Sequence, residues 1–297
     1  TLQQLKYVVT VARTGSMSEA SKELFISQPG LTTSIRELET EMGIKIFTRT
    51  NKGVVTSNEG ERFLGYARQV LEQASLLEGV YKSGTKIKQQ FCVSTQHYSF
   101  AVNAFVDLIR RFAGEEYDFS LRETETYEII DDVAKMKSEI GILYLNSFNK
   151  DALMKIIKSK SLTFTELFTA KPHVFVSTDH PLADKKSVTM EELADYPYLS
   201  FEQGEHNSFY YSEEIFSTVG RTKNIRVTDR ATLFNLLIGL NGYTVCSGVI
   251  DNELNGDNIT AIPLDEEGGM KIGYIENKKI LHSNLAEAYI EALKKHI

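Results

Sequence analysis

The side chains with the most informative chemistry lie between residues 28 and 36. Helical spacing places four of them on one face, with a fifth at the exposed start of the same helix: Pro29, Thr32, Thr33 and Arg36, preceded by Gln28. Glutamine can pair with adenine, arginine with guanine or phosphate, and short hydroxyls with several base edges in the DNA major groove. The pattern predicts a DNA-recognition helix. The alternative is the solvated face of a helix in some other small helical unit.

The opposite face of this helix is apolar. Leu31, Ile35 and Leu38 recur at helical spacing and would face a core. Ser27 is a suitable N-cap for the helix and Gly43 a suitable stop. The segment therefore has both ends of a helix and one face to bury.

Two further helices are predicted before it. Residues 2–14 have the periodicity of an amphipathic helix. Ser16 and Glu19 form a capping box that opens a second helix, which runs to about Leu24. Two short helices joined by a tight turn at residues 25–26 are typical of a helix-turn-helix.

A short hairpin is predicted after the third helix. Residues 44–47 and 54–56 are two candidate strands, and a hairpin in this place would be the wing of a winged helix. Near its tip, Arg49, Thr50 and Lys52 are placed to contact the DNA backbone rather than base edges. The alternative is a solvated hairpin tip.

A second group of polar side chains follows predicted strands in the later part of the chain. Strand ends and helix starts that face a common crevice are the usual ligand positions in open α/β sheets, and free amides there suit an anion. The candidate effector-binding residues are Ser94, Thr95, Gln96, His97, Thr124, Glu125, Thr126, Ser200, Phe201, Glu202, Ser247 and Gly248. The alternative for each hydroxyl is a helix cap. The acidic Glu125 and Glu202 would suit a zwitterion, such as an amino acid or its acylated precursor.

The elements that would position this second group alternate between strands and helices from residue 90 onwards. Short apolar strands, for example residues 91–93, 118–122 and 140–145, alternate with amphipathic helices. Helices are also predicted at residues 190–194 and 212–219. This rhythm indicates an α/β domain with a mostly parallel sheet.

A long helix between the two regions is predicted to mediate dimerisation. Thr56 and Glu59 would form a capping box that opens it, and it would run to about Val80. Residues 83–86 would then form a hinge. Apolar side chains recur at alternating spacings of four and three along this helix, as in a coiled-coil seam: Phe63, Ala67, Val70, Ala74 and Leu77.

Charge is unevenly distributed along the chain. The net charge is −7 over 297 residues, but residues 1–90 carry 12 Lys and Arg against 9 Asp and Glu, a net charge of +3. The remainder carries 21 against 31, a net charge of −10. A mildly basic head therefore precedes an acidic body, and the local field at the DNA matters more than the total. We find no apolar window long enough to span a membrane and no secretory signal, so a cytoplasmic protein is expected.

Cysteine and histidine usage predicts no metal site and no cofactor. Cys92 and Cys246 lie on predicted strands, where buried structural thiols are expected; a redox-sensing pair is the alternative. The histidines lack metal-ligand spacing. Residues 239–242 resemble a dinucleotide motif only weakly, and they follow a helix rather than a strand, so this reading is rejected.

Together these motifs resemble the LysR-type transcriptional regulators along the whole chain. The matching tracts are residues 18–24, 27–29, 35–39, 43–49, 56–61 and the Asp-His-Pro-Leu-Ala tract at 179–183. Gly30 and the Thr32-Thr33 pair depart from the family pattern, which puts the DNA preference in question rather than the fold. Residues 94–98 and 228–233 are similar to a Gram-positive subgroup associated with sulfur amino-acid metabolism.

The resemblance implies a domain organisation. Residues 1–58 would form a winged helix-turn-helix, and residues 59–87 a linker helix and hinge. A two-lobed, periplasmic-binding-protein-like α/β sensor would follow, with lobe I at 88–161 plus 268–297 and lobe II at 162–267. The ligand would lie between lobes that close like a hinge.

The resemblance also implies partners. These would be double-stranded DNA, a small-molecule effector that changes DNA binding or bending, further copies of the chain in a homodimer or homotetramer, and RNA polymerase, without a membrane. The chain would be a regulator and not an enzyme. The rivals are a solute-binding protein or a small-molecule enzyme with the same two-lobed fold.

Overall fold

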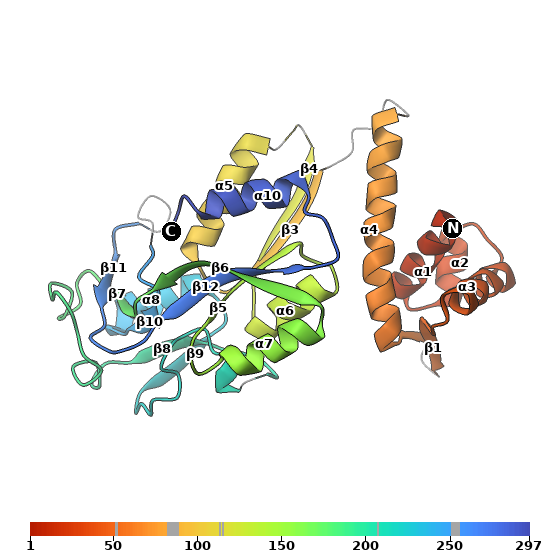
Figure 1. The fold of residues 1–297 in the computed structure, drawn as a ribbon. Helices are drawn as coiled ribbons and strands as arrows, with labels where there is room; N and C mark the ends of the chain where they lie inside the picture. The colour runs from red at the N-terminus through yellow and green to blue at the C-terminus, as the bar shows by residue number, and fades with distance from the viewer. Residues whose placement is uncertain (51–52, 82–88, 113, 115, 207, 251–255) are drawn as a thin grey trace. The chain divides into compact units, whose positions relative to one another are not determined.

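The computed structural model describes residues 1–50, 53–81, 89–112, 114, 116–206, 208–250 and 256–297 (Figure 1). These residues form two compact units: the first comprises residues 1–88 together with Lys135–Lys137, and the second comprises Gln89–Ala134 and Ser138–Ile297. The hinge predicted at residues 83–86 lies outside the described residues. Each unit has its own hydrophobic core and is treated by itself below.

The N-terminal unit is mostly helical. Its elements are α1 (Leu2–Thr14), α2 (Met17–Glu23), α3 (Gln28–Met42), β1 (Phe47–Thr50), β2 (Gly53–Thr56) and α4 (Asn58–Tyr81). The predicted apolar stripe of α3 is confirmed as core, because Leu31, Ile35 and Leu38 are all buried. Val8, Val11 and residues of α2 and α4 complete this core.

The first strand of the wing lies three residues later than predicted. β1 pairs antiparallel with β2 from Phe47 opposite Thr56 to Thr50 opposite Gly53, so the strand predicted at residues 44–47 begins only at Phe47. The reason is a contact with α3. The carboxylate Oε1 of Glu39 accepts hydrogen bonds from the amides of Ile46 and Phe47 at 2.8 and 3.1 Å. The chain before Phe47 is thereby fixed to α3 rather than paired in the hairpin.

This buried carboxylate leads to a prediction about stability and pH. Burial raises the pKa of Glu39, but the amides of Phe47 and Ile46 and the ammonium of Lys45 outweigh it and lower the pKa below its usual value. A carboxyl group whose pKa is lower in the folded than in the unfolded state stabilises the fold at pH values above its unfolded-state pKa. This stabilisation is lost as the pH falls through the folded-state pKa. We expect Glu39→Gln to lower the free energy of unfolding by about 1–3 kcal/mol at neutral pH. The loss of stability between neutral and acidic pH that Glu39 causes should be absent in this variant. Urea denaturation of both proteins at about four pH values between 3 and 7 measures the free energy of unfolding.

The matched control is Glu37→Gln, because Glu37 is exposed on the same helix. This control should follow the wild-type profile. Parallel pH profiles for Glu39→Gln and the wild type would show that Glu39 is not the anchoring charge.

The long helix α4 begins one residue later than its predicted cap implies. Its first turn is capped by Ser57, whose hydroxyl accepts the amide of Gly60 at 2.9 Å, so the predicted capping box of Thr56 and Glu59 is wrong. Gly60 is required by close packing, since a Cβ there would lie 2.2 Å from the carbonyl oxygen of Ile46. The junction between wing and helix is therefore tightly specified.

The predicted dimer seam on α4 is only partly available to a second chain. Phe63 packs against the core of the N-terminal unit, and Ala67 is buried in the single chain. Val70 and Leu77 are 46% and 62% exposed, although both are large and apolar. The free part of the seam thus lies along the C-terminal half of α4.

The second unit contains a five-stranded mixed sheet. Its order is β4-β3-β5-β12-β6, in which β3 is parallel to β4 and β5 while β12 is antiparallel to β5 and β6. The strands are β3 (Gln89–Thr95), β4 (Tyr117–Glu123), β5 (Ile140–Leu145), β6 (Leu162–Ala170) and β12 (Met270–Asn277). β6 is therefore parallel to β5, and β12 alone runs against the other four strands, so the sheet is mostly parallel, as predicted.

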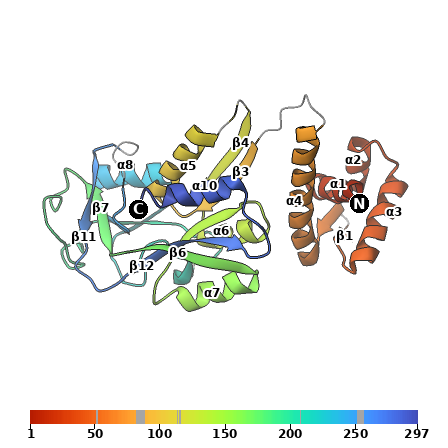
Figure 2. The same ribbon diagram turned by 45° about the horizontal axis from the view of Figure 1, so that its top comes forward.

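Helices cover both faces of this sheet. On one face α5 (Ser99–Phe112) and α10 (Asn284–Leu293) lie side by side (Figure 2) and bury a large apolar cluster with the sheet. On the other face α6 (Thr126–Ala134) and α7 (Lys150–Ser159) enclose a second cluster that includes Ile129. Both faces of the sheet are thus buried, which explains the fully buried strand β5.

A second sheet forms the other lobe of this unit. The antiparallel strands β10 (Thr244–Cys246), β7 (His173–Ser177) and β11 (Ile259–Pro263) lie in that order. The parallel pair β8 (Tyr198–Phe201) and β9 (Asn224–Val227) joins them through a bridge between Tyr198 and Tyr243. The helix α8 (Arg230–Leu240) and the short 3₁₀ helix η1 (Phe209–Tyr211) complete the elements that matter here.

Two predicted helices of this lobe are not formed. Residues 190–194 form hydrogen-bonded turns, in which Ala194 donates to Glu191 three residues back. Residues 212–219 are irregular, and Phe216 has a φ of 64°, which a right-handed helix excludes. The strands β6 and β11 were not predicted, because their side chains are mostly half-buried and carry no clear alternation.

The chain passes between the lobes later than the sequence suggested. β6 pairs along its length with β12, from Ala170 opposite Met270 to Leu162 opposite Asn277. Residues 162–170 therefore belong to the five-stranded sheet. We propose that lobe II begins near residue 171 rather than at residue 162.

Candidate nucleic-acid interface and interlobe pocket

The helix α3 presents the polar face that its sequence predicts. Its N-cap is Ser27, whose hydroxyl accepts the amide of Gly30 at 3.3 Å, and it ends at Gly43 in the left-handed conformation. Gln28, Pro29, Thr33 and Arg36 are exposed, and Thr32 is half-buried. The face opposite the core is therefore open to a partner along two turns.

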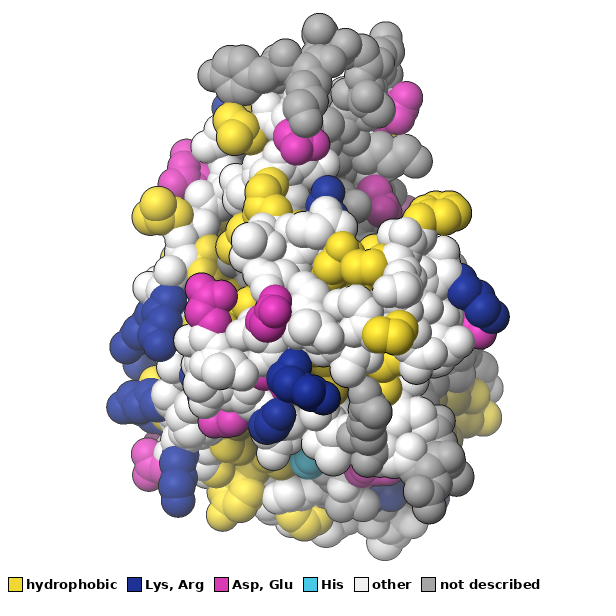
Figure 3. All heavy atoms as spheres, turned by 90° about the vertical axis from the view of Figure 1, so that its right-hand side faces the viewer, with side chains coloured by type: hydrophobic (Ala, Val, Ile, Leu, Met, Phe, Trp, Pro, Cys, Tyr) yellow, Lys and Arg dark blue, Asp and Glu magenta, His cyan; other side chains and the backbone are white. Residues whose placement is uncertain are grey.

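Arg36 is a cation without a carboxylate partner among the described residues. Three other cations of the unit are paired: Arg13 contacts Glu23, Lys22 contacts Glu19, and Lys45 contacts Glu39. Figure 3 looks onto this side of the chain and shows Lys and Arg side chains gathered on the left of the view, with only scattered hydrophobic side chains. The surface thus has charge available for phosphates or base edges, without a large apolar patch.

The predicted contacts of the wing stay predictions. The side chain of Arg49 and the whole of Lys52 lie outside the described residues. Thr50 is exposed, and its hydroxyl donates to the carbonyl of Gly53 at 3.3 Å across the hairpin.

Three of the predicted effector residues face the interior of lobe I instead of a pocket. The hydroxyl of Ser94 bonds to Asp132 and Ser138, both at 2.8 Å, and that of Thr95 donates to the neighbouring carbonyl. The side chain of Gln96 is engaged at both ends: its Nε2 donates to Thr126 Oγ1 at 2.6 Å, and its Oε1 accepts from the hydroxyl of Tyr98 and from the backbone amide of Tyr144. These buried groups hold the end of β3 in place.

A chain of hydrogen bonds joins the two lobes next to these residues. The amide of Thr126 donates to Gln203 Oε1 at 3.0 Å, and Gln203 Nε2 donates to Glu213 Oε1 at 3.1 Å. Glu213 Oε2 in turn accepts the backbone amide of His97 at 3.0 Å and lies 2.9 Å from His97 Nδ1. The ring of His97 stacks on Phe201 with centroids 3.7 Å apart. His97 and Thr126 of lobe I are thus tied to lobe II.

The remaining predicted residues do not come together. Glu125 lies against Gly204, and Glu202 is exposed. Gly248 sits over the ring of His173, where only a glycine fits at its φ of 79°. Thr124 and Ser200 do not line the pocket described below. Glu125 and Glu202, the two carboxylates predicted to suit a zwitterion, do not line that pocket.

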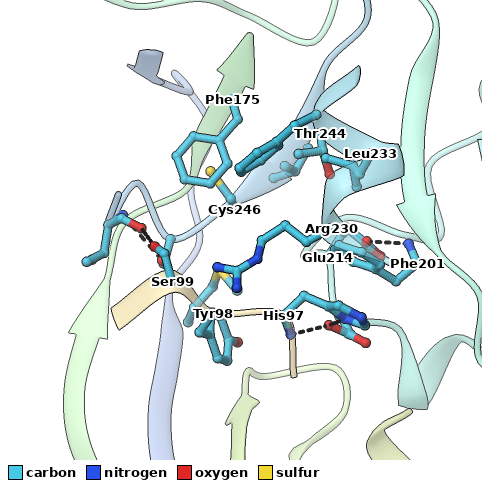
Figure 4. A pocket seen from close by; sticks show the side chains of 16 residues that line it. His97, Tyr98, Ser99, Phe175, Phe201, Glu214, Arg230, Leu233, Thr244 and Cys246 are labelled. Atoms are coloured by element: carbon cyan, nitrogen blue, oxygen red, sulfur yellow. Dashed lines mark hydrogen bonds and ion pairs between the residues drawn. The ribbon is translucent and has the colours of Figure 1, made fainter. Parts of the chain in front are cut away.

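A pocket does open between the lobes beside His97 (Figure 4), with about 540 Å³ of empty space including the part open to solvent. Three predicted residues line it: His97, Phe201 and Ser247. Its other polar lining is Ser99, Glu213, Glu214, Arg230 and Thr244. The apolar lining includes Phe175, Leu233, Phe234, Val245, Val249 and Met270. A mostly apolar wall with a few convergent polar groups is typical of small-molecule sites.

Arg230 is the most prominent polar group in this pocket. It is the first residue of α8, which Asp229 caps, and its guanidinium extends into the space between Ser99 and Phe175 (Figure 4). Its Nη2 lies 2.6 Å from Glu123 Oε1 of lobe I, but its Nη1 is buried without a hydrogen-bond partner. The hydroxyl of Thr244, a residue only 4% exposed, is also buried without one.

Two carboxyl groups in or beside the pocket, Glu214 and Glu123, have raised pKa values. Burial, and then the adjacent Glu213, raise the pKa of Glu214 to about 8, and its Oε1 accepts the amide of Phe201 at 2.8 Å. Burial lowers the pKa of His97, but Glu213 outweighs this and the net shift is upwards. Burial raises the pKa of Glu123 despite Arg230. At neutral pH Glu214 is therefore mostly protonated, and no unpaired ionised carboxylate faces the space.

A local signal could have found Arg230. It follows β9 directly at a strand-to-helix junction, the same kind of position that was used to predict the other effector residues. Its neighbours Asp229 and Thr232 form an N-cap, which marks the helix start. Thr244 and Glu214 carry no such signal, because an isolated threonine in a strand and one glutamate in an irregular segment are ordinary surface patterns.

The two cysteines lead to a prediction about redox sensitivity. Burial raises the pKa of both thiols; Cys92 lies on β3 with its Sγ 3.1 Å from the hydroxyl of Ser138, and Cys246 lies on β10 in the other sheet. Because the thiolate is the reactive form, we expect both to react with an aromatic disulfide reagent at pH 7 roughly tenfold or more slowly than in the unfolded chain. The variants Cys92→Ser and Cys246→Ser each lack one thiol, so they show which cysteine gives which kinetic phase of the reaction. Fast reaction of the native chain, or a disulfide formed by peroxide, would revive the redox-sensing alternative.

A winged helix-turn-helix unit and a two-lobed α/β unit with a pocket between its lobes define a DNA-binding regulator with a ligand-binding domain. Comparison with known families agrees. Residues 2–61 match the bacterial regulatory helix-turn-helix protein, lysR family, and residues 93–297 match the LysR substrate binding domain. The chain belongs to the LysR family.

Individual relatives share its sequence or its fold. An uncharacterised helix-turn-helix regulator of Escherichia coli, YnfL, is 29% identical over 205 residues, which are 68% of this chain and 65% of that protein. The regulator CysB of Burkholderia cenocepacia is 28% identical over 208 residues, 68% of this chain and 63% of that one. The matches thus span less than two thirds of these relatives. A full-length OxyR variant from Pseudomonas aeruginosa has the same fold, with a TM-score of 0.64 at 19% identity over 99% of this chain and 97% of that one.

The family matches decide between the protein classes considered from the sequence. The predicted fold class and family are confirmed. The rival interpretations, a solute-binding protein or a small-molecule enzyme, receive no support from these matches. None of the helices in the described ranges is long and apolar enough to cross a membrane.

Proposed function

We propose that this chain is a transcriptional regulator that binds double-stranded DNA through α3 and its wing, under the control of a small molecule held between the sensor lobes. The observation that carries the proposal is the exposed polar face of α3, with Arg36 uncompensated, in a chain that also has an interlobe pocket. Arg36 would bond to guanine or phosphate, and Thr32 and Thr33 to base edges. Arg49, Thr50 and Lys52 would contact the backbone.

The unit that binds DNA is a dimer in this proposal, with a homotetramer as the larger assembly. Val70, Ala74 and Leu77 lie on one side of α4 at heptad spacing, and the first and last of them are exposed. A dimer with two recognition helices reads two half-sites that lie about one helical turn, or a multiple of it, apart. The regulator would act in the cytoplasm, where its DNA lies, and would communicate with RNA polymerase.

The lobes offer a physical route for effector control. Both contribute to the pocket, and four contacts link them: Thr126 to Gln203, His97 to Glu213, Glu123 to Arg230, and Ser99 to the carbonyl of Val249 at 3.2 Å. A ligand that contacts both lobes favours the closed arrangement by its differential affinity for it. A change in the lobe angle would then alter the spacing of the DNA-binding units.

The experiment that tests the DNA-binding part is an electrophoretic mobility shift with the DNA upstream of the chain's own gene. Specific binding should survive excess unrelated DNA and weaken steeply as salt rises, because each phosphate contact releases counterions. Binding that is equal on unrelated DNA, or that does not depend on salt, would contradict the proposal.

A further inference from the structure

We infer that the interlobe pocket selects a small monocarboxylate with a compact, uncharged apolar body, whose carboxylate bonds to Arg230 Nη1 while Thr244 Oγ1 offers a second hydrogen-bonding point. This inference rests on the proposed effector role of the pocket. It assigns the ligand class from three features of the lining: two buried polar atoms that lack partners, an apolar wall, and the state of the acidic groups.

The two unpartnered atoms are the first feature. Buried polar groups are nearly always hydrogen-bonded, and each exception requires an explanation. Arg230 Nη1 and Thr244 Oγ1 are both buried, both line the same pocket, and both lack a protein partner among the described residues. A guanidinium nitrogen can only donate, so its missing partner is an acceptor. An ionised acceptor forms the stronger and shorter bond.

The wall around these atoms is the second feature. Phe175, Leu233, Phe234 and Val249 belong to the apolar lining of the pocket that Arg230 also lines. Such a wall favours a hydrocarbon body over a second charged group, because burying an unpaired charge there is costly. A polyanion would leave its other charges against phenylalanine and leucine.

The acidic groups are the third feature, and they argue against an amino acid. Glu123 is paired with Arg230, and Glu213 is engaged by His97 and Gln203. Glu214 is 2% exposed and mostly protonated at neutral pH. An ammonium group would therefore find no free carboxylate in the pocket. The zwitterion expected from the sequence fits this lining less well than its deaminated counterpart.

Carboxylate binding should take up protons. The charged groups near Arg230 and Glu214 are His97, Glu123, Glu213 and the capping Asp229. Three buried tyrosines also face Glu214, and burial raises their pKa values, so they stay neutral over this pH range: Tyr98, Tyr144 and Tyr198. A bound anion raises the pKa of His97 and Glu214 further, so the complex holds more protons than the free protein. Affinity for a carboxylate then falls as pH rises from 6 to about 8.5. The affinity for an amine would instead rise with pH, because a bound ammonium group stabilises the ionised form of Glu214.

The test uses ligands with one carbon skeleton and the full-length protein. Isocaproate, leucine, isoamylamine and isocaproamide differ only in their charged or polar groups, and acetate and phenylacetate bracket the size. Calorimetry and thermal shift at up to about 10 mM detect even a millimolar site. We expect isocaproate or phenylacetate to bind at least about tenfold more tightly than leucine, isoamylamine or isocaproamide, and to bind more weakly at high pH.

Two variants and one control locate the contact. Arg230→Met should lower the affinity for the preferred carboxylate at least about tenfold, and Thr244→Val roughly threefold to tenfold. Arg226→Met should bind as the wild type does, because Arg226 is exposed on β9 of the same lobe. If Arg230→Met does not fold, Thr244→Val and the wild-type pH slope still decide the matter.

Several outcomes would overturn the inference. These are no response to any carboxylate, tighter binding of leucine or isoamylamine, affinity that rises with pH, or full affinity in Arg230→Met and Thr244→Val. The effector role fails separately. If a carboxylate binds in this way but leaves the mobility shift on promoter DNA unchanged, the ligand class stands and effector control does not.

Discussion

Replacing Arg36 with alanine should abolish specific DNA binding while leaving the protein folded. Arg36 is exposed, and within the described residues it has no carboxylate partner, so its removal leaves no buried group unsatisfied. Each arginine that reads a base contributes about 1–3 kcal/mol. A dimer loses this contribution at both half-sites, which corresponds to a loss of roughly thirtyfold to ten-thousandfold in affinity. Fluorescence anisotropy with labelled operator DNA measures the change.

Three comparisons separate recognition from structure. Arg36→Lys should recover part of the affinity, because lysine keeps the charge but loses the planar fork. Arg111→Ala removes the same charge from an exposed site on α5 and should bind DNA normally. The thermal unfolding of Arg36→Ala should match that of the wild type. A variant that binds operator DNA normally would show that α3 is not the reading element, and a large loss of stability would show that Arg36 is structural.

Placing an aspartate at Leu77 or Val70 should convert the protein to monomers. Both side chains are large, apolar and exposed in the single chain, and they lie at heptad spacing on one helix, which favours a seam with a second chain. Burying a leucine contributes about 1.5–3 kcal/mol, and a symmetric seam contains each position twice. A buried aspartate adds a charge-burial cost, so the dissociation constant should rise about a hundredfold or more. Sedimentation velocity at micromolar concentration measures the assembly, and operator affinity should fall with it.

The matched control for this experiment is Leu281→Asp. Leu281 is 94% exposed in the sensor unit, so the same chemical change there should alter neither mass nor DNA binding. An unchanged sedimentation coefficient for Leu77→Asp and Val70→Asp would refute the proposed seam. A change caused equally by Leu281→Asp would point to a different contact.

The recognition helix could be predicted because its determinants are local. The spacing of Leu31, Ile35 and Leu38 fixes which face is buried, and Ser27 and Gly43 fix its ends. These signals act within a few residues of each other. The start of the wing could not be predicted in the same way, because it depends on Glu39 reaching residues seven and eight positions ahead. The cap of α4 was misassigned because Thr56 and Ser57 are both suitable residues, and only the packing of Gly60 selects Ser57.

The interlobe pocket was predictable in position but not in composition. Strand ends correctly indicated His97, Phe201 and Ser247. Ser94, Thr95 and Gln96 have the same polar character, but hydrogen bonds to Asp132, to a neighbouring carbonyl and to Thr126 hold them inside lobe I. Arg230 and Glu123 lie far apart in sequence, and their pairing exists only once both lobes have folded. Long-range contacts of this kind leave no trace in local periodicity.

The central claim is that α3 and its symmetry mate read two half-sites in front of a ligand-binding domain. A nuclease footprint of the full-length protein on the DNA upstream of its own gene tests this most directly. The account predicts two protected half-sites whose centres lie about 10 base pairs, or a multiple of that, apart, and their loss in Arg36→Ala. Protection that is uniform along the DNA, absent, or unchanged in Arg36→Ala would contradict it.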